Sequence, residues 1–132
     1  AMIIHSDDGL DEISIAAGTQ VAELRDGNIN SYTVNPGDFA MEVQSLDGLS
    51  VDSAEASANL IHSALDGDTS ERARKAAAII AINAGAAIYV SGVAATLADG
   101  VALAEDVLAT GQAAEKLRAF LDLTQLMQGE AG

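Results

Sequence analysis

Four carboxylate side chains lie within six residues near the start of the sequence: Asp7, Asp8, Asp11 and Glu12. Carboxylates this close together repel one another at neutral pH, and a divalent cation that prefers oxygen ligands relieves the repulsion. Mg²⁺ typically takes one or two protein carboxylates and fills its other positions with water and substrate phosphates. The spacing is not that of an EF-hand loop, in which acids alternate and end in a distant Glu. The cluster therefore has the donor chemistry of a magnesium site.

The same residue types also form ordinary solvated turns, because Asp and Gly are common there. On spacing alone, an acidic turn is the commoner interpretation. The position favours a site, since the cluster directly follows the apolar run Met2–His5, which predicts a short strand buried on both faces. Loops after such strands bind ligands in open α/β sheets. His5, at the end of the strand, is either a strand-end hydrogen-bonding residue or a member of the site.

The other polar residues give weaker signals. His62 has no second ligand at metal spacing and is expected on the surface of a helix. Arg72, Arg74 and Lys75 form a small basic cluster whose simplest interpretation is a solvated helix face. Since the sequence has no Ser-His-Asp arrangement and no nucleophile elbow, hydrolase chemistry of that kind is not indicated.

Length, composition and charge limit the classes of protein. The chain has 132 residues, 49% of them hydrophobic, and a formal charge of −14. It is long enough for one domain and apolar enough to fill a core. The negative charge opposes binding to nucleic acid and to anionic membranes. Zero cysteines and no recognisable signal peptide lead us to expect a cytoplasmic protein.

The first part of the chain, residues 1–51, is predicted to hold the strands. Asp26-Gly27-Asn28 separates the alternating segments 21–25 and 29–34, which predicts a β-hairpin with a type I′ turn. Pro36 ends the second of these strands, because proline has no N–H for a ladder. Ile13 and Ile15 alternate with Ser14 and suggest another short extended piece. Residues 39–51 read as a loop.

Residues 52–132 are predicted to form four helices packed over the sheet. The first is capped by Asp52-Ser53 and closed by Gly67, and the second runs from about Ser70 to Val90. The third follows Thr96 and ends at Gly111, after which the fourth begins near Gln112. No charged residue occurs from position 76 to 98. We interpret the second helix as a core helix buried on all sides rather than a membrane span, because its apolar stretch is shorter than the ~20 residues a span needs.

The acidic segment belongs to a longer and more specific string. Ile3-Ile4-His5-Ser6, followed by Asp8-Gly9-Leu10-Asp11-Glu12-Ile13-Ser14, resembles the catalytic half of the anthranilate phosphoribosyltransferase family. The similarity continues in the same order through residues 19–27, 36–39, 81–89, 100–104 and 111–117. A pyrimidine-nucleoside phosphorylase has a related architecture, but the Asp-Gly-Leu-Asp-Glu string favours the anthranilate enzymes.

The resemblance implies a fold and a reaction. The fold is the C-terminal portion of a nucleoside-phosphorylase/phosphoribosyltransferase-type α/β domain, with short strands and a hairpin followed by four helices. The reaction transfers phosphoribosyl from phosphoribosyl pyrophosphate to anthranilate, in tryptophan biosynthesis. In such enzymes Mg²⁺ is held by an Asp-Glu pair, which corresponds to Asp11 and Glu12, so that Asp11 contacts the substrate through the metal. Asp8 and His5 are further possible site residues, and Gly9 is expected to permit the turn.

The resemblance also implies what these 132 residues lack. The family's glycine-rich pyrophosphate loop, its Lys-His-Gly-Asn segment, the arginine that meets anthranilate and the helical domain that forms its homodimer all lie upstream of the acidic segment. We therefore expect residues 1–132 to be a single truncated catalytic-domain piece, with the metal loop in 1–51 and a helical part in 52–132. We expect it to contain no catalytic residue, to be inactive alone, and to self-associate through exposed apolar surface. A non-catalytic acidic interaction module and a nucleic-acid-binding relative of the same fold remain the alternatives.

Overall fold

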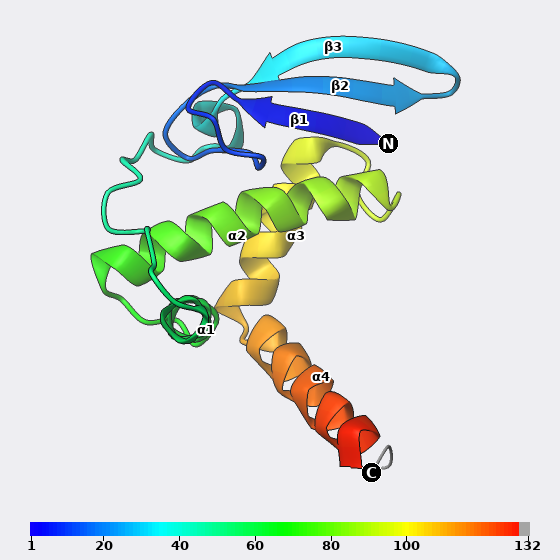
Figure 1. The fold of residues 1–132 in the computed structure, drawn as a ribbon. Helices are drawn as coiled ribbons and strands as arrows, with labels where there is room; N and C mark the ends of the chain where they lie inside the picture. The colour runs from blue at the N-terminus through cyan, green and yellow to red at the C-terminus, as the bar shows by residue number, and fades with distance from the viewer. Residues whose placement is uncertain (130–132) are drawn as a thin grey trace.

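A computed structural model describes residues 1–129 as a three-stranded antiparallel sheet beside four α-helices (Figure 1). The strands follow one another in the order β1-β2-β3. The predicted class, short strands with a hairpin followed by four helices, is confirmed. The elements are β1 (Met2–Ser6), β2 (Thr19–Arg25), β3 (Asn28–Val34), the 3-10 helix η1 (Pro36–Phe39), α1 (Ala54–Leu65), α2 (Glu71–Val90), α3 (Leu97–Ala109) and α4 (Gln112–Gly129).

The hairpin between β2 and β3 forms where the sequence predicts it. Arg25 pairs with Asn28, which leaves Asp26 and Gly27 as the two turn residues. Their φ angles are 51° and 78°, and two positive φ angles are what a type I′ turn requires. β3 ends at Val34, and Pro36 begins the short helix η1 instead of continuing the strand. The turn therefore fixes the register between β2 and β3, which continue the sheet beyond β1.

The prediction that the first strand is buried on both faces is wrong within residues 1–129. Among these residues β1 is an edge strand that pairs only with β2, and its side chains alternate between the two faces of the sheet. Ile3 on the outer face is 76% exposed, because nothing in residues 1–129 covers that face. The expected extended piece around Ser14 is not a strand either. Ile13 and Ile15 are fully buried, but they lie in the loop between β1 and β2.

The core lies between the inner face of the sheet and the helices α2 and α3. It is formed by residues from the loop, two strands and both helices: Ile13, Val21, Val34, Ile82 and Val101. Figure 1 shows α2 running beneath the sheet with α3 crossing it. The close crossing depends on small residues, since a Cβ on Gly85 would lie 2.5 Å from the Cα of Val101. The loop that carries the acidic cluster contributes Ile13 to this core.

The helices begin at the predicted capping residues. The side chains of Ser53, Ser70 and Thr96 each accept a hydrogen bond from a backbone N–H in the first turn of the following helix. The prediction that all four helices pack over the sheet is wrong for two of them. α1 and α4 pack against helices, α1 against α2 and α4 against α3, and Figure 1 shows both on the side of α2 away from the sheet.

The helix α2, which carries no charged residue from Ala76 to Val90, is buried on one side only. Ala81, Ile82 and Gly85 are buried, whereas Val90 is 47% exposed. The prediction of a helix buried on all sides is therefore wrong within residues 1–129. By length and composition α2 could also cross a membrane, a test that core helices pass as well. Its packing against α1, α3 and the acidic loop agrees with the interpretation as a core helix.

Candidate functional site

The acidic cluster lies in the loop of residues 7–18, which connects β1 to β2. A tight turn opens the loop: the N–H of Ser6 donates to the carbonyl of Leu10 at 3.0 Å, and the N–H of Gly9 donates to the carbonyl of Ser6 at 2.9 Å. Gly9 has a φ of 91°, a conformation that side chains with a Cβ rarely adopt. The expected role of Gly9 in the turn is confirmed. The turn ties Leu10 to the end of β1.

The far side of the loop is tied to α2. The N–H of Ile13 donates to Oδ1 of Asn83 at 2.8 Å, and Nδ2 of Asn83 donates to the carbonyl of Ile13 at 3.0 Å. The buried side chain of Ile13 enters the core beside these bonds. Asp11 and Glu12 are therefore a two-residue span between two fixed points, Leu10 and Ile13. A span this short leaves the backbone beneath the two carboxylates little freedom.

Asp8 stabilises the loop through hydrogen bonds to other residues of the loop. Its Oδ2 accepts a hydrogen bond of 2.6 Å from the buried hydroxyl of Ser14, and its Oδ1 accepts a weaker one of 3.4 Å from the N–H of Leu10. The bond from Ser14 holds the pKa of Asp8 below its usual range, because the bond stabilises the ionised form. Asp7 is bonded as well, accepting from the side-chain amide of Gln20 at 3.3 Å. Both carboxylates thus already have protein partners.

Asp11 and Glu12 differ from the other two acids. All four acids are exposed, but Asp11 and Glu12 take part in no hydrogen bond or ion pair within residues 1–129. Over the same residues, no three His, Cys, Asp or Glu side chains come together as a complete metal cage. Mg²⁺ does not need such a cage, since one or two carboxylates suffice when water and phosphate supply the other ligands. The carboxylates of Asp11 and Glu12 match the one or two protein ligands of such a coordination shell.

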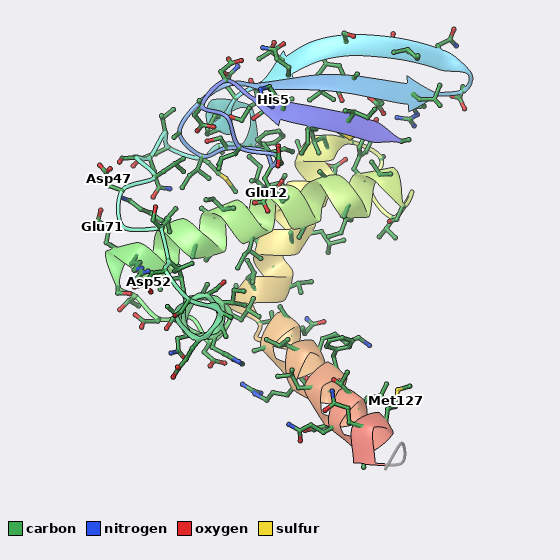
Figure 2. All side chains as sticks on the ribbon, viewed as in Figure 1. His5, Glu12, Asp47, Asp52, Glu71 and Met127 are labelled. Atoms are coloured by element: carbon green, nitrogen blue, oxygen red, sulfur yellow. The ribbon has the colours of Figure 1, made fainter. Side chains whose placement is uncertain are left out.

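His5 lies apart from this pair. It is exposed and shares the outer face of β1 with Ile3, while Ile4 and Ser6 face the core. In Figure 2, His5 is labelled on the strand, whereas Glu12 is labelled below the sheet, next to α2. The structure therefore does not bring His5 together with Glu12.

The basic cluster at the start of α2 serves the fold. Lys75 is 8% exposed, pairs with Glu71 at 3.0 Å, and donates to the carbonyl of Asp47 at 3.3 Å. Arg72 donates to the carbonyl of Ser50 at 3.2 Å. Figure 2 shows Asp47 and Glu71 together at this end of α2, away from Glu12. The basic cluster, expected to be a solvated helix face, thus also donates hydrogen bonds to the preceding loop.

Sequence reasoning missed a polar network on the other end of α2. The hydroxyl of Tyr89 donates to Glu23 at 2.7 Å and accepts from Arg25 at 2.7 Å, and the hydroxyl of Tyr32 donates to the second oxygen of Glu23 at 3.0 Å. The bond from Tyr89 is the main reason that the pKa of Glu23 is lowered. Burial, followed by the bond to Glu23, raises the pKa of Tyr32 to about 12. The network joins β2 and β3 to α2.

Comparison with known proteins identifies a family and relatives of this chain. Residues 1–114 match the family described as glycosyl transferase family, a/b domain. The chain is 57% identical over 125 residues to the anthranilate phosphoribosyltransferase of Teredinibacter turnerae, covering 95% of this chain and 37% of the relative. It is 55% identical over 125 residues to the enzyme of the same name from Saccharophagus degradans, with the same coverage of 95% and 37%. The chain thus spans little more than a third of these relatives.

Solved structures agree with the sequence comparison. The anthranilate phosphoribosyltransferase of Thermus thermophilus superposes with a TM-score of 0.78 at 29% identity, over 92% of this chain and 35% of that one. The enzyme from Saccharomyces cerevisiae in complex with PRPP and Mg superposes with a TM-score of 0.74 at 22% identity, over 92% of this chain and 34% of that one. The second likeness is evidence for the fold alone.

Proposed function

Because this chain belongs to the glycosyl transferase family, a/b domain, we propose that it is the metal-binding part of an anthranilate phosphoribosyltransferase. The complete enzyme would join the amine nitrogen of anthranilate to C1 of phosphoribosyl pyrophosphate. The bond between C1 and the pyrophosphate oxygen breaks and the amine nitrogen releases one proton, giving N-(5-phosphoribosyl)anthranilate and pyrophosphate. Cytoplasmic tryptophan biosynthesis is the setting that we propose, and the strong identity to relatives of that name supports the assignment.

We propose Asp11 and Glu12 as the magnesium ligands of the site. A metal bound there would offset the negative charge that develops on the departing pyrophosphate. The chain's own residues would fix the position of the metal's positive charge. Asp11 and Glu12 present free carboxylate oxygens, while Asp8 accepts from Ser14 and is a brace of the loop rather than a ligand.

One observation carries the proposal. All four clustered acids are exposed, but only Asp11 and Glu12 have no partner in residues 1–129, and the backbone on each side of them is held by hydrogen bonds. A solvated turn would not require anchors at both Leu10 and Ile13. Two exposed carboxylates on neighbouring residues of a fixed span offer a cation the one or two protein oxygen ligands that Mg²⁺ takes.

The chain by itself is proposed to be inactive. It spans 37% of the length of the relatives named above. The phosphate-binding glycine-rich loop that the resemblance implies lies outside these 132 residues. Without it, the pyrophosphate would meet the metal but not the donors that bind its remaining oxygens. The homodimer is likewise proposed only for the complete enzyme.

A chimera tests the assignment. The matching part of the Teredinibacter turnerae enzyme is replaced by this chain, and turnover of anthranilate and phosphoribosyl pyrophosphate is measured at several Mg²⁺ concentrations. We expect activity within about tenfold of the parent, and a loss of at least ~100-fold in Asp11→Asn with a higher Mg²⁺ requirement. Asp52→Asn, a change of the same charge at an exposed position, is the matched control.

Two results would contradict the proposal. A folded chimera without activity would argue against the assignment to anthranilate phosphoribosyltransferases. Asp11→Asn and Glu12→Gln chimeras with the parent's Mg²⁺ dependence would exclude these residues as ligands. A separate assay of the 132-residue chain alone should show no turnover, and turnover near that of the chimera would show that the chain is not inactive alone.

A further inference from the structure

We propose that Asn83 is a positioning residue for the carboxylates of Asp11 and Glu12, an inference that rests on the metal site proposed above. Asn83 lies on α2, 70 residues away in sequence from the residue it bonds. Its side-chain amide binds both backbone polar groups of Ile13, which directly follows Glu12. The structure thus fixes the end of the metal loop through one side chain.

The first of these bonds acts on Glu12 directly. The N–H of Ile13 belongs to the peptide group whose carbonyl is that of Glu12, and it donates to Oδ1 of Asn83 at 2.8 Å. Because a peptide group is planar, holding its N–H sets the direction in which the chain leaves Glu12. The second bond, 3.0 Å from Nδ2 of Asn83 to the carbonyl of Ile13, holds the following peptide group. Two successive peptide planes are therefore set by one amide.

Asn83 is itself held in one orientation. Its Nδ2 also donates to the carbonyl of Ile79, one turn earlier on α2, at 3.0 Å. Both hydrogens of the amide are thus engaged, and its oxygen is the acceptor for Ile13. The helix is rigid at this point, because Ile82 is fully buried and Gly85 is in contact with α3. The hydrogen bonds of Asn83 therefore tie the loop to a helix that is itself packed into the core.

No other residue type of similar size both accepts from the N–H and donates to the carbonyl of Ile13. Ile13 is buried and lies outside any strand, so without Asn83 its N–H and carbonyl would have no partner among residues 1–129. An Asp at this position could accept from the N–H but would repel both carbonyls. It would also add a negative charge near Glu12. An amide is the group that serves both partners.

Mn²⁺ binding followed by NMR tests the proposal. Mn²⁺ replaces Mg²⁺ as the probe, because it broadens the amide signals of nearby residues even when binding is weak. In the ¹⁵N-labelled 132-residue chain we expect the signals of Asp11, Glu12 and Ile13 to broaden first. The exposed acids Asp66 and Asp68 are the internal reference for nonspecific binding to this acidic chain. We expect Asn83→Ala to require about tenfold more Mn²⁺ for equal broadening.

Two further variants separate positioning from general stability. Thr96→Ala removes the N-terminal cap of α3 and should lower the urea midpoint of unfolding without changing the Mn²⁺ response. Asn83→Gln keeps the amide but moves it by one methylene, and should weaken binding by less than Asn83→Ala does. If Asn83→Ala does not fold, the comparison of Asn83→Gln with Thr96→Ala decides. Hydrogen exchange of the Ile13 amide supplies a readout without metal, and it should accelerate at least ~tenfold in Asn83→Ala, beyond any change in the strand amides.

The failures are distinguishable. If the wild-type signals of the loop do not broaden before those of Asp66 and Asp68, or if Asp11→Asn leaves the broadening unchanged, the metal site is wrong and the inference falls with it. If Asp11→Asn abolishes the selective broadening but folded Asn83→Ala retains the wild-type response, the metal site stands and the positioning role is wrong. Faster exchange at Ile13 with an unchanged Mn²⁺ response would likewise assign Asn83 to folding alone.

Discussion

Gly100 on α3 lies directly against the backbone carbonyl of Gly85 on α2, so that a Cβ at Gly100 would overlap the carbonyl oxygen. Gly85 in turn faces the backbone of Val101. Each glycine thus makes room for the helix that carries the other. The crossing brings Val101 and Ile82 into the core beneath the sheet, and it holds the segment of α2 from which Asn83 reaches the acidic loop.

Gly100→Ala should therefore destabilise the fold. The added methyl has no free space, and the obstacle is backbone that can move only if the two helices separate. We expect a loss of about 2–3 kcal/mol in the free energy of unfolding, measured by urea denaturation. Gly37→Ala is the matched control, because a Cβ there meets nothing and its φ is not positive. Equal stability of the two variants would show that the helices do not depend on this contact.

Tyr89→Phe should change the dependence of stability on pH. The hydroxyl of Tyr89 lowers the pKa of Glu23 below its usual 4.5, so its contribution is complete above that value and is lost as pH falls through the lowered pKa. At neutral pH we expect Tyr89→Phe to cost about 1 kcal/mol. The gap from wild type should narrow below pH 4.5, measured by urea denaturation across the acid range. A constant gap would mean that the charge of Glu23 does not take part.

The hydroxyl of Tyr32 should lose its proton only at unusually high pH. Its pKa is raised from 10.0 to about 12, chiefly by burial and then by the bond to Glu23. The corresponding stability is present below the unfolded value of 10.0 and is lost as pH rises through about 12. In Tyr89→Phe, which leaves Tyr32 as the one tyrosine, ultraviolet absorbance of tyrosinate should rise near that pH. Glu23→Gln should lower the midpoint, with circular dichroism to confirm that the chain is still folded; a midpoint at the ordinary value would contradict the bond.

The apolar side of α4 should cause self-association. Phe120, Leu123 and Met127 recur at helical spacing on one face and are 59%, 55% and 63% exposed. Light scattering over a concentration series should give a mass that increases with concentration. Leu123→Lys should reduce this increase, whereas Gln125→Lys, with the same added charge on the other side of the helix, should not. A concentration-independent monomer mass for the wild type would refute the expectation.

Local sequence signals determined the elements that depend on neighbouring residues. Asp26-Gly27 specified the hairpin turn, and Ser53, Ser70 and Thr96 marked helix starts, because these signals act within one turn of the backbone. The string Asp8–Ser14 identified the family, which the comparisons then showed. The sequence did not reveal that one face of β1 is uncovered within residues 1–129, since an apolar run is the same whether one or both faces are covered.

The candidate site divides in the same way. The sequence by itself selected the acidic segment, and its resemblance to the family implied Asp11 and Glu12 as the pair that we propose to bind the metal. Only the tertiary structure decided that Asp8 is occupied by Ser14, that His5 faces the other side of the sheet, and that Asn83 holds Ile13. Residue types fix which chemistry is available. Which side chains meet depends on contacts between segments far apart in the chain, and those contacts are set when α2 and α3 close beneath the sheet.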